Sequence, residues 1–245
     1  GALLVLDAYQ SMGAVPLDVT ALDVDILVGG SVKWLCGGPG AGYLYAHPRL
    51  IENLQPRDAG WFSHARPFAF EPPPIELATG IARFTGGTPN MPAYYQAREG
   101  YKIVPEAGVD AIREKARRQT QIIFDGARER GLTVNSPEAF ERRGNHVTID
   151  FPGAEAVKAE LIRRGFVVDY RPGAGIRVAP HFYTDDDEYW KQVLARRFFQ
   201  GHSVGTPNIY HEFPDCIIAF QNRVRELTDL PISHEPITAH TPRLR

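Results

Sequence analysis

Cysteine, an excess of either charge and long hydrophobic runs are all scarce in this sequence. Its 245 residues include only two cysteines, Cys36 and Cys216, which lie far apart and make neither a disulfide framework nor a metal-ligand cluster. We therefore predict no metal site. The formal net charge of −2 does not favour nucleic acid or an anionic membrane as a partner. No apolar run is long enough to span a bilayer and no signal peptide is visible, so the expected location is a reducing cytoplasm.

The residues that are present are typical of a globular protein. Hydrophobic residues make up 43% of the chain and charged residues 23%, and the length allows one or two domains. The sequence opens Gly-Ala-Leu-Leu-Val-Leu-Asp, without an initiator methionine and directly in an apolar run. We therefore expect that the first part of a longer protein is missing.

Two apolar segments near the N-terminus each lead to a polar group. Residues 3–7 have the pattern of a fully buried strand that ends in Asp7, and residues 25–29 form a second strand candidate that leads to Ser31 and Lys33. Ligands bind at the carboxyl ends of strands in open α/β sheets, so Asp7 and Lys33 could lie around one small ligand. The alternative for Asp7 is a turn or helix-capping residue.

The surroundings of Lys33 single it out. The stretch VGGSVKWLCGGPGAG, residues 28–42, places this lysine between apolar side chains and a glycine cluster. Partial burial would lower the pKa of the amine and allow it to attack a carbonyl. The glycines would let the backbone come close to a ligand. The alternative is a glycine-rich turn whose lysine reaches water.

The middle of the chain contains one long irregular segment, which is followed by helical patterns. We predict a strand at 41–46, a short helix at 48–54, and an irregular segment over 55–90 whose length is typical of a functional loop. Within it, Trp61 and Phe62 are either ligand contacts or loop anchors. Helical periodicity covers 91–104 and 106–130. Four basic residues of the second helix are predicted to form a solvated face: Arg113, Lys115, Arg117 and Arg118.

The remaining patterns predict a small α+β unit. Its helices are expected at 154–164 and 185–199, and its strands at 132–135, 146–151, 166–170 and 176–179. The tail beyond residue 200 shows no sustained periodicity, and its role is unknown.

Five short motifs, taken in order, resemble the class V branch of fold-type I pyridoxal phosphate (PLP) enzymes. They are Asp-x-x-Gln (Asp7, Gln10), Ser-x-Lys (Ser31, Lys33), Gly-Trp-Phe (Gly60–Phe62), Gly-Thr-Pro (Gly87–Pro89) and Gly-Ile-Arg-Val-Ala-Pro (Gly175–Pro180). Within that branch, the stretches LDAYQSMGAVPLDV, SVKWLCGGPGAGYLY, GWFSHARP and RGFVVDYRPGAGIRVAPHFY are most similar to kynureninase.

The resemblance implies an α/β fold. Residues 1–98 would be the second half of a PLP-binding large domain with a mostly parallel sheet. Residues 99–199 would be the small C-terminal α+β domain, and 200–245 a tail without counterpart. The N-terminal third of the family would be absent.

The resemblance also implies a role for each matched residue at the cofactor. Lys33 would hold PLP as an internal aldimine and move the proton at the substrate Cα, and Asp7 would pair with the protonated pyridine nitrogen. Gln10 would lie near the phenolic oxygen. Ser31 would bind the phosphate of the cofactor. Trp61 and Thr88 would bind the phosphate in the partner subunit's site, in a homodimer with shared active sites.

On the substrate side, the resemblance implies roles for two further residues. Arg177 would clamp the α-carboxylate in a bidentate fork, a geometry that lysine cannot supply. Its alternative is a strand-end arginine in a surface ion pair. Phe62 would contact the substrate.

Three functions follow from these observations. The first is a PLP-dependent hydrolase of the kynureninase type, which cleaves L-kynurenine to anthranilate and L-alanine in tryptophan catabolism. The second is a class V aminotransferase, epimerase or lyase acting on another amino acid. It is favoured by Val32, where kynureninases carry tyrosine, and by the lack of an asparagine near Gly86–Gly87. The third is a truncated, inactive chain that serves as a dimerisation or binding module.

Overall fold

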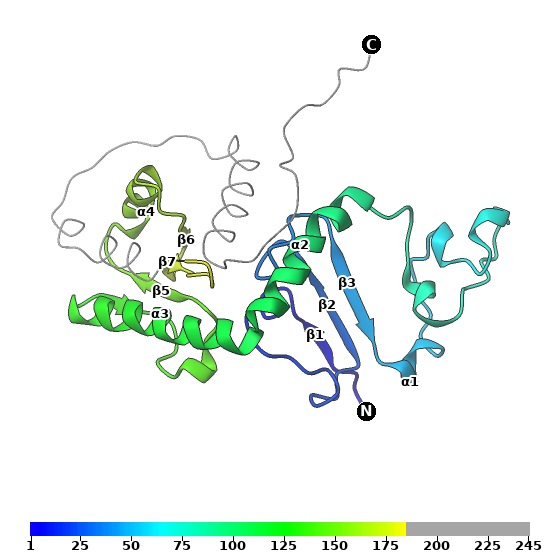
Figure 1. Cartoon of the computed structure of the whole chain (residues 1–245), viewed down its shortest axis with the longest axis horizontal. Coiled ribbons are helices and arrows are strands. Elements are labelled where there is room, and N and C mark those ends of the chain that lie inside the picture. The colour runs from blue at the N-terminus through cyan, green and yellow to red at the C-terminus, as the bar shows by residue number, and fades with distance from the viewer. Residues whose placement is uncertain (185–245) are drawn as a thin grey trace, which may run out of the picture. The chain divides into compact units, whose positions relative to one another are not determined.

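The computed structural model describes residues 1–184, which contain two β-sheets and two long helices (Figure 1). The helix expected at 185–199 and the tail at 200–245 lie outside the described residues. Within the described part of the chain, no helix is long and apolar enough to cross a membrane.

The first sheet has three strands in the order β1-β2-β3. β1 (Val5–Asp7) runs parallel to β2 (Ile26–Gly30), and β3 (Gly42–Ala46) runs antiparallel to β2. The register pairs Asp7 with Val28, so the carboxyl ends of β1 and β2 lie at the same end of the sheet. Asp7 and the segment that carries Lys33 therefore leave the sheet on one side.

The prediction that residues 3–7 form a fully buried strand is wrong. Val5 is 57% exposed, because β1 lies at the edge of the sheet and β2 is its only partner among residues 1–184. The buried contact of this region is made instead by Leu27 of β2, which packs with Ala8 and Val24.

The segment that follows β3 is more ordered than its composition suggests. It contains helix α1 (Pro48–Ile51) and three short 3₁₀ helices, η1 (Trp61–Ser63), η2 (Pro67–Ala69) and η3 (Gly80–Phe84). Arg83 is buried and donates to the carbonyl oxygens of Ile51, Glu52 and Leu54 and to the Glu52 carboxylate. One arginine thus anchors η3 to the end of α1.

Two long helices connect the sheets. α2 (Met91–Ala107) and α3 (Val109–Glu129) agree with the predicted helices and are separated by Gly108, whose φ of 79° breaks the helical path. The buried face of α3 repeats at helical spacing through Ile112, Ala116, Ile123 and Phe124. The predicted domain boundary after residue 98 falls inside α2, and the division into domains remains a prediction.

The second sheet is antiparallel throughout and has the order β4-β5-β7-β6. Its elements, in chain order, are β4 (Thr133–Val134), η4 (Phe140–Arg142), β5 (Val147–Asp150), α4 (Ala154–Arg163), β6 (Asp169–Arg171) and β7 (Gly175–Val178). Three of the four strands were predicted close to these positions. β6 begins at Asp169, three residues later than the predicted strand at 166–170.

Alternation along β5 and β7 gives this sheet two different faces. Val147, Ile149, Ile176 and Val178 are buried in one core with residues of α3 and α4. The intervening residues, which include Thr148 and its cross-strand partner Arg177, lie on the other face. The sheet therefore has one core face and one polar face.

The fold class is confirmed as α/β with a smaller α+β unit. The sheet that was expected to be mostly parallel has one parallel and one antiparallel pairing among the described strands.

The core of the second sheet gives a first prediction. Ile123 is 0% exposed, so Ile123→Ala should lower the free energy of unfolding by about 2–5 kcal/mol, because it leaves a cavity beside β5 and β7. Ile122→Ala is the matched control, since Ile122 is 44% exposed and should change stability by only about 0.5 kcal/mol. Urea denaturation measures both. Equal losses in the two variants would contradict the assigned core.

Candidate active site

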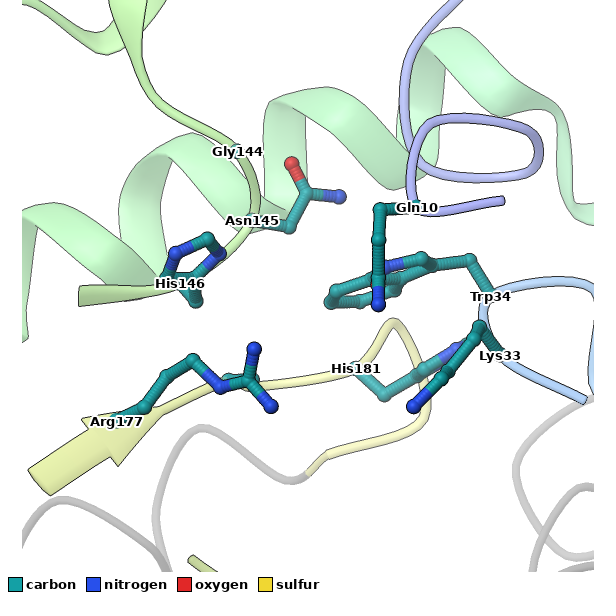
Figure 2. A pocket seen from close by; sticks show the side chains of 9 residues that line it. Gln10, Lys33, Trp34, Gly144, Asn145, His146, Arg177 and His181 are labelled. Carbon is teal, nitrogen blue, oxygen red and sulfur yellow. The ribbon is translucent and has the colours of Figure 1, made fainter. Parts of the chain in front are cut away.

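A cavity of about 310 Å³ lies where loops from the two sheets meet (Figure 2). The first sheet contributes Gln10, which follows β1, and Lys33 and Trp34, which follow β2. The second sheet contributes residues that directly precede β5 and residues of β7 and the segment after it: Asn145, His146, Arg177 and His181. The cavity therefore brings together three residues that were predicted from separate motifs, namely Gln10, Lys33 and Arg177.

Lys33 points into this cavity but is not buried. Its neighbours Trp34 and Leu35 are 9% and 8% exposed, whereas Lys33 belongs to the exposed residues. Leu35 packs with Val104 of α2 and Ile112 of α3. The expected partial burial of the lysine is therefore wrong: the apolar residues beside it anchor the loop and leave the amine accessible.

The loop around Lys33 is closed by its own backbone. The Ser31 N–H donates to Ala41 O over 2.9 Å, and the Gly37 N–H donates to Ser31 O over 2.8 Å. The Ser31 hydroxyl is fully buried and donates to Gly38 O over 2.8 Å. A hydroxyl has a single proton to donate, so Ser31 can donate to a phosphate only if its hydrogen bond to Gly38 O breaks. Its role at a phosphate remains a prediction.

The glycine cluster brings the loop close to helix α2. A Cβ on Gly37 would lie 2.9 Å from the Cβ of Ala97, and a Cβ on Gly100 would overlap the carbonyl oxygen of Leu35. The close approach expected from these glycines is thus an approach between two parts of the chain. It sets the short distance between the Lys33 loop and α2.

Asp7 ends β1 at the same edge of the sheet. Its Oδ1 accepts a hydrogen bond from the Tyr9 N–H over 2.9 Å, which is the turn-capping contact considered as its alternative. Its side chain is not among those that line the cavity. The pairing of Asp7 with a pyridine nitrogen remains a prediction.

Arg177 is held on one edge by an acidic neighbour. Its Nε and Nη2 donate to the two oxygens of Asp169 over 3.0 and 2.6 Å. The ion pair considered as the alternative for Arg177 therefore exists, but it occupies only part of the guanidinium. Nη1 has no hydrogen-bond partner among residues 1–184, and the side chain lines the cavity.

The sequence motifs do not single out His181, although it directly follows the Gly175–Pro180 motif that contains Arg177. Its ring stacks on Trp34 with centroids 4.8 Å apart, and its Nε2 lies 3.6 Å from the Sγ of Cys36. Nδ1 accepts the Phe182 N–H, so we assign the ring proton to Nε2. Burial lowers the pKa of His181 to about 3 and raises the pKa of the Cys36 thiol to about 12. Both groups are neutral, and the rings of His181 and Trp34 form an uncharged wall of the cavity.

Asn145 and His146 were also missed. The Asn145 amide donates to Ala14 O over 3.1 Å and accepts from Arg113 Nη1 over 2.5 Å, so it ties the loop after β1 to α3. Arg113 is consequently half-buried and is not part of a solvated face, which corrects that prediction. Burial, and then the charge of Arg177, lower the pKa of His146.

The aromatic residues of the long segment do not line the cavity. Trp61 and Phe62 lie with ring centroids 4.1 Å apart and pack against Phe68 and Phe70, which are 72% and 74% exposed. Thr88 is exposed in the loop after η3. Their roles at a phosphate and at the substrate remain predictions. Among the described residues, no cluster of three or more acidic, histidine or cysteine side chains could hold a metal ion.

The contact between α2 and the Lys33 loop gives a second prediction. In an exposed helix, Gly→Ala stabilises by about 1 kcal/mol. At Gly100 the sign should reverse, with a loss of about 1–3 kcal/mol in the free energy of unfolding, because the new methyl group overlaps Leu35 O. Gly87→Ala is the control, since its Cβ would meet nothing within 4 Å. A stabilised Gly100→Ala variant in urea denaturation would contradict this packing.

The neutral wall gives a third prediction, on pH. The pKa of folded His181 lies below its ordinary value of 6.5, so the unfolded chain takes up the proton first and stability falls as the pH drops below about 6.5 toward 3. His181→Phe keeps an aromatic ring but cannot titrate. Its unfolding free energy should fall less steeply between about pH 6 and pH 4, by up to about 1.4 kcal/mol per pH unit. Parallel slopes for the two proteins would contradict the burial of a neutral His181.

Comparisons with known proteins agree with this geometry. The family model "Aminotransferase class-V" matches residues 1–177. A kynureninase from Pseudomonas fluorescens is 32% identical over 199 residues, which are 79% of this chain and 48% of that protein. The uncharacterized aminotransferase YcbU from Bacillus subtilis (strain 168) is 32% identical over 188 residues, 77% of this chain and 49% of the relative. The chain thus spans about half the length of the curated relatives it matches.

A solved structure extends the comparison to the fold. A variant of C-DES, a cystine C–S lyase, with glycine covalently linked to its PLP cofactor, has a TM-score of 0.68 and 25% identity. The match covers 78% of this chain and 50% of that one. With the family model matched over most of its length, this chain belongs to the class-V aminotransferase family of PLP-dependent enzymes.

Proposed function

We propose that the chain is part of a PLP-dependent hydrolase of the kynureninase type, which cleaves the Cβ–Cγ bond of L-kynurenine to give anthranilate and L-alanine. The observation that carries the proposal is the convergence of Lys33, Gln10 and Arg177 on one cavity of about 310 Å³. Amino-acid chemistry on PLP needs an amine that holds the cofactor and a cation that holds the substrate carboxylate. Both have candidates in this cavity.

The residues at the cavity fit the cofactor. Lys33 is exposed there and forms no ion pair within residues 1–184, so its amine is available to a carbonyl. Asp7 lies at the same edge of the sheet, and among the described residues only one of its oxygens is engaged, by Tyr9. Bound PLP supplies an electron sink for the charge that develops at the substrate Cα.

Four residues of the chain have distinct roles in this proposal. Lys33 holds the cofactor and moves the proton at the substrate Cα. Asp7 keeps the ring nitrogen protonated, and Gln10 hydrogen-bonds the phenolic oxygen. Arg177 orients the substrate through its carboxylate.

Further parts of the proposal concern groups beyond the cavity. Ser31 would bind the phosphate, and Phe62 would contact the substrate. In a cytoplasmic homodimer with shared active sites, Trp61 and Thr88 would bind the phosphate in the partner's site. The stacked rings of Trp34 and His181 suit an aryl-containing substrate, because they offer an uncharged aromatic surface.

A second candidate keeps the cofactor and changes the reaction to that of an aminotransferase, epimerase or lyase on another amino acid. Val32 favours it, because valine cannot offer the phosphate the hydroxyl of the tyrosine found there in kynureninases. The equal identity to a kynureninase and to an uncharacterized aminotransferase also supports it. A truncated chain that serves only as a dimerisation or binding module is the third candidate.

The fourth prediction tests the cofactor lysine. Incubation with PLP followed by borohydride reduction should leave a pyridoxyl adduct on Lys33, which peptide mass spectrometry locates. Lys33→Ala should form no adduct. Its turnover should fall at least about a hundredfold, because the substitution removes the group that moves the proton. Lys102→Ala is the control, since Lys102 is exposed and pairs with Glu99 on α2. An unmodified Lys33 would exclude both enzymatic candidates for this chain.

Product analysis separates the remaining two. The adduct-forming protein should release anthranilate from L-kynurenine, which its fluorescence reports. A protein that binds PLP at Lys33 without releasing anthranilate would exclude the hydrolase and leave the second candidate.

A further inference from the structure

We infer that Asp169 is a positioning residue for Arg177. It holds the Nε–Nη2 edge of the guanidinium so that the adjacent Nη1–Nη2 edge receives the substrate carboxylate. This inference rests on the proposed function of Arg177. Asp169 lies inside one of the stretches that resemble kynureninase, but the resemblance gives it no role. It becomes visible only through its contacts in the second sheet.

The ion pair is built into the strand register. Asp169 of β6 lies directly across from Arg177 of β7, so both side chains leave the same face of the sheet. Directly opposed residues of antiparallel strands have their Cβ atoms about 5 Å apart, which suits a short acid and a long base. A slip of one residue would move Asp169 to the other face. The contact is therefore as rigid as the sheet.

The geometry leaves a defined part of Arg177 free. A guanidinium has five N–H groups, and Asp169 takes one from Nε and one from Nη2. Both N–H groups of Nη1 and one of Nη2 remain without a partner among residues 1–184. Figure 2 shows the guanidinium directed into the cavity, on the side that also holds His181 and Lys33. The free edge has the spacing that binds a carboxylate through two parallel hydrogen bonds.

Arg171 determines the charge of the arrangement. Its Nη2 lies 2.9 Å from Asp169 Oδ2, the oxygen that accepts from Arg177 Nη2. A pair of Asp169 and Arg177 alone would be neutral and would attract a carboxylate weakly. With Arg171 the three groups carry one net positive charge, while burial and the neighbouring Arg177 lower the pKa of His146 beside them. The fork is thus oriented by an acid without losing its attraction for an anion.

The fifth prediction tests this role in the PLP-loaded full-length protein. Asp169→Ala should raise KM for the amino-acid substrate at least about tenfold with kcat changed much less, because a fork that swings freely binds the carboxylate poorly. It should also reduce the preference of the enzyme for the substrate over its decarboxylated amine. Asp169→Asn keeps one hydrogen-bond acceptor, so its KM should lie between those of the wild type and Asp169→Ala. In an Arg177→Ala background, Asp169→Ala should have no further effect on KM.

Glu160→Ala is the matched control. Glu160 on α4 also binds two arginines, Arg163 and Arg164, but neither of them lines the cavity, whereas Arg177 does. Its loss should leave KM unchanged. If Asp169→Ala leaves KM unchanged, the inference is overturned. A lower KM would overturn it as well, since Asp169 would then compete with the substrate for Arg177.

A second readout needs neither cofactor nor turnover. The Arg177 Nε–H resonance, assigned by its loss in Arg177→Lys, should exchange slowly with solvent in the wild type and rapidly in Asp169→Ala. It should shift saturably with L-alanine and not with L-alaninamide, and that shift should vanish in Asp169→Ala. If L-alanine does not shift the wild-type resonance, the inference is overturned, whether or not the protein turns over kynurenine. Failure of the lysine adduct alone would instead refute the proposed function.

Discussion

The site depends on one close contact, between the Lys33 loop and helix α2. Leu35 packs on Val104 and Ile112, and the absence of a side chain at Gly100 lets α2 reach the carbonyl group of Leu35. Trp34 and Leu35 are buried while Lys33 is exposed, so the contact that anchors the loop leaves the amine accessible. Burial of the neighbours, and not of the lysine itself, is what the apolar sequence around Lys33 encodes.

The other half of the site follows from alternation in the second sheet. Val147, Ile149, Ile176 and Val178 fill the core, and the residues between them must face the opposite way. That face carries Arg177 and its acidic partner Asp169. Asn145 then links the halves, because it binds Ala14 near the first sheet and Arg113 on α3. The distance between the lysine and the arginine is therefore set by buried hydrogen bonds as well as by the fold.

The sequence was informative where a local pattern decides the structure, and less so where partners far along the chain do. The apolar runs predicted β2 and β5, and helical spacing predicted α2 and α3, because burial of one face fixes both patterns. The exposure of β1 could not be read, since it depends on which strands lie beside it. Arg113 looked like a solvated charge, yet Asn145 and two carbonyl groups enclose it, and nothing in its own helix indicates them. Asp169 was missed for the same reason: its partner is eight residues away and across a strand pair.

The charge of the cavity narrows what it can hold. Within the described part of the chain, no acidic side chain lines it: the ionisable groups there are Lys33, Arg177 and the two histidines His146 and His181. Burial lowers the pKa of both histidines, so the imidazoles add hydrogen-bonding capacity without adding charge. A cavity of this kind favours ligands with anionic groups, such as a phosphate and a carboxylate, over cationic ones. Asp169 is outside the lining and is also paired with Arg171, so the acid that orients the guanidinium leaves the site with a net positive charge for the anion.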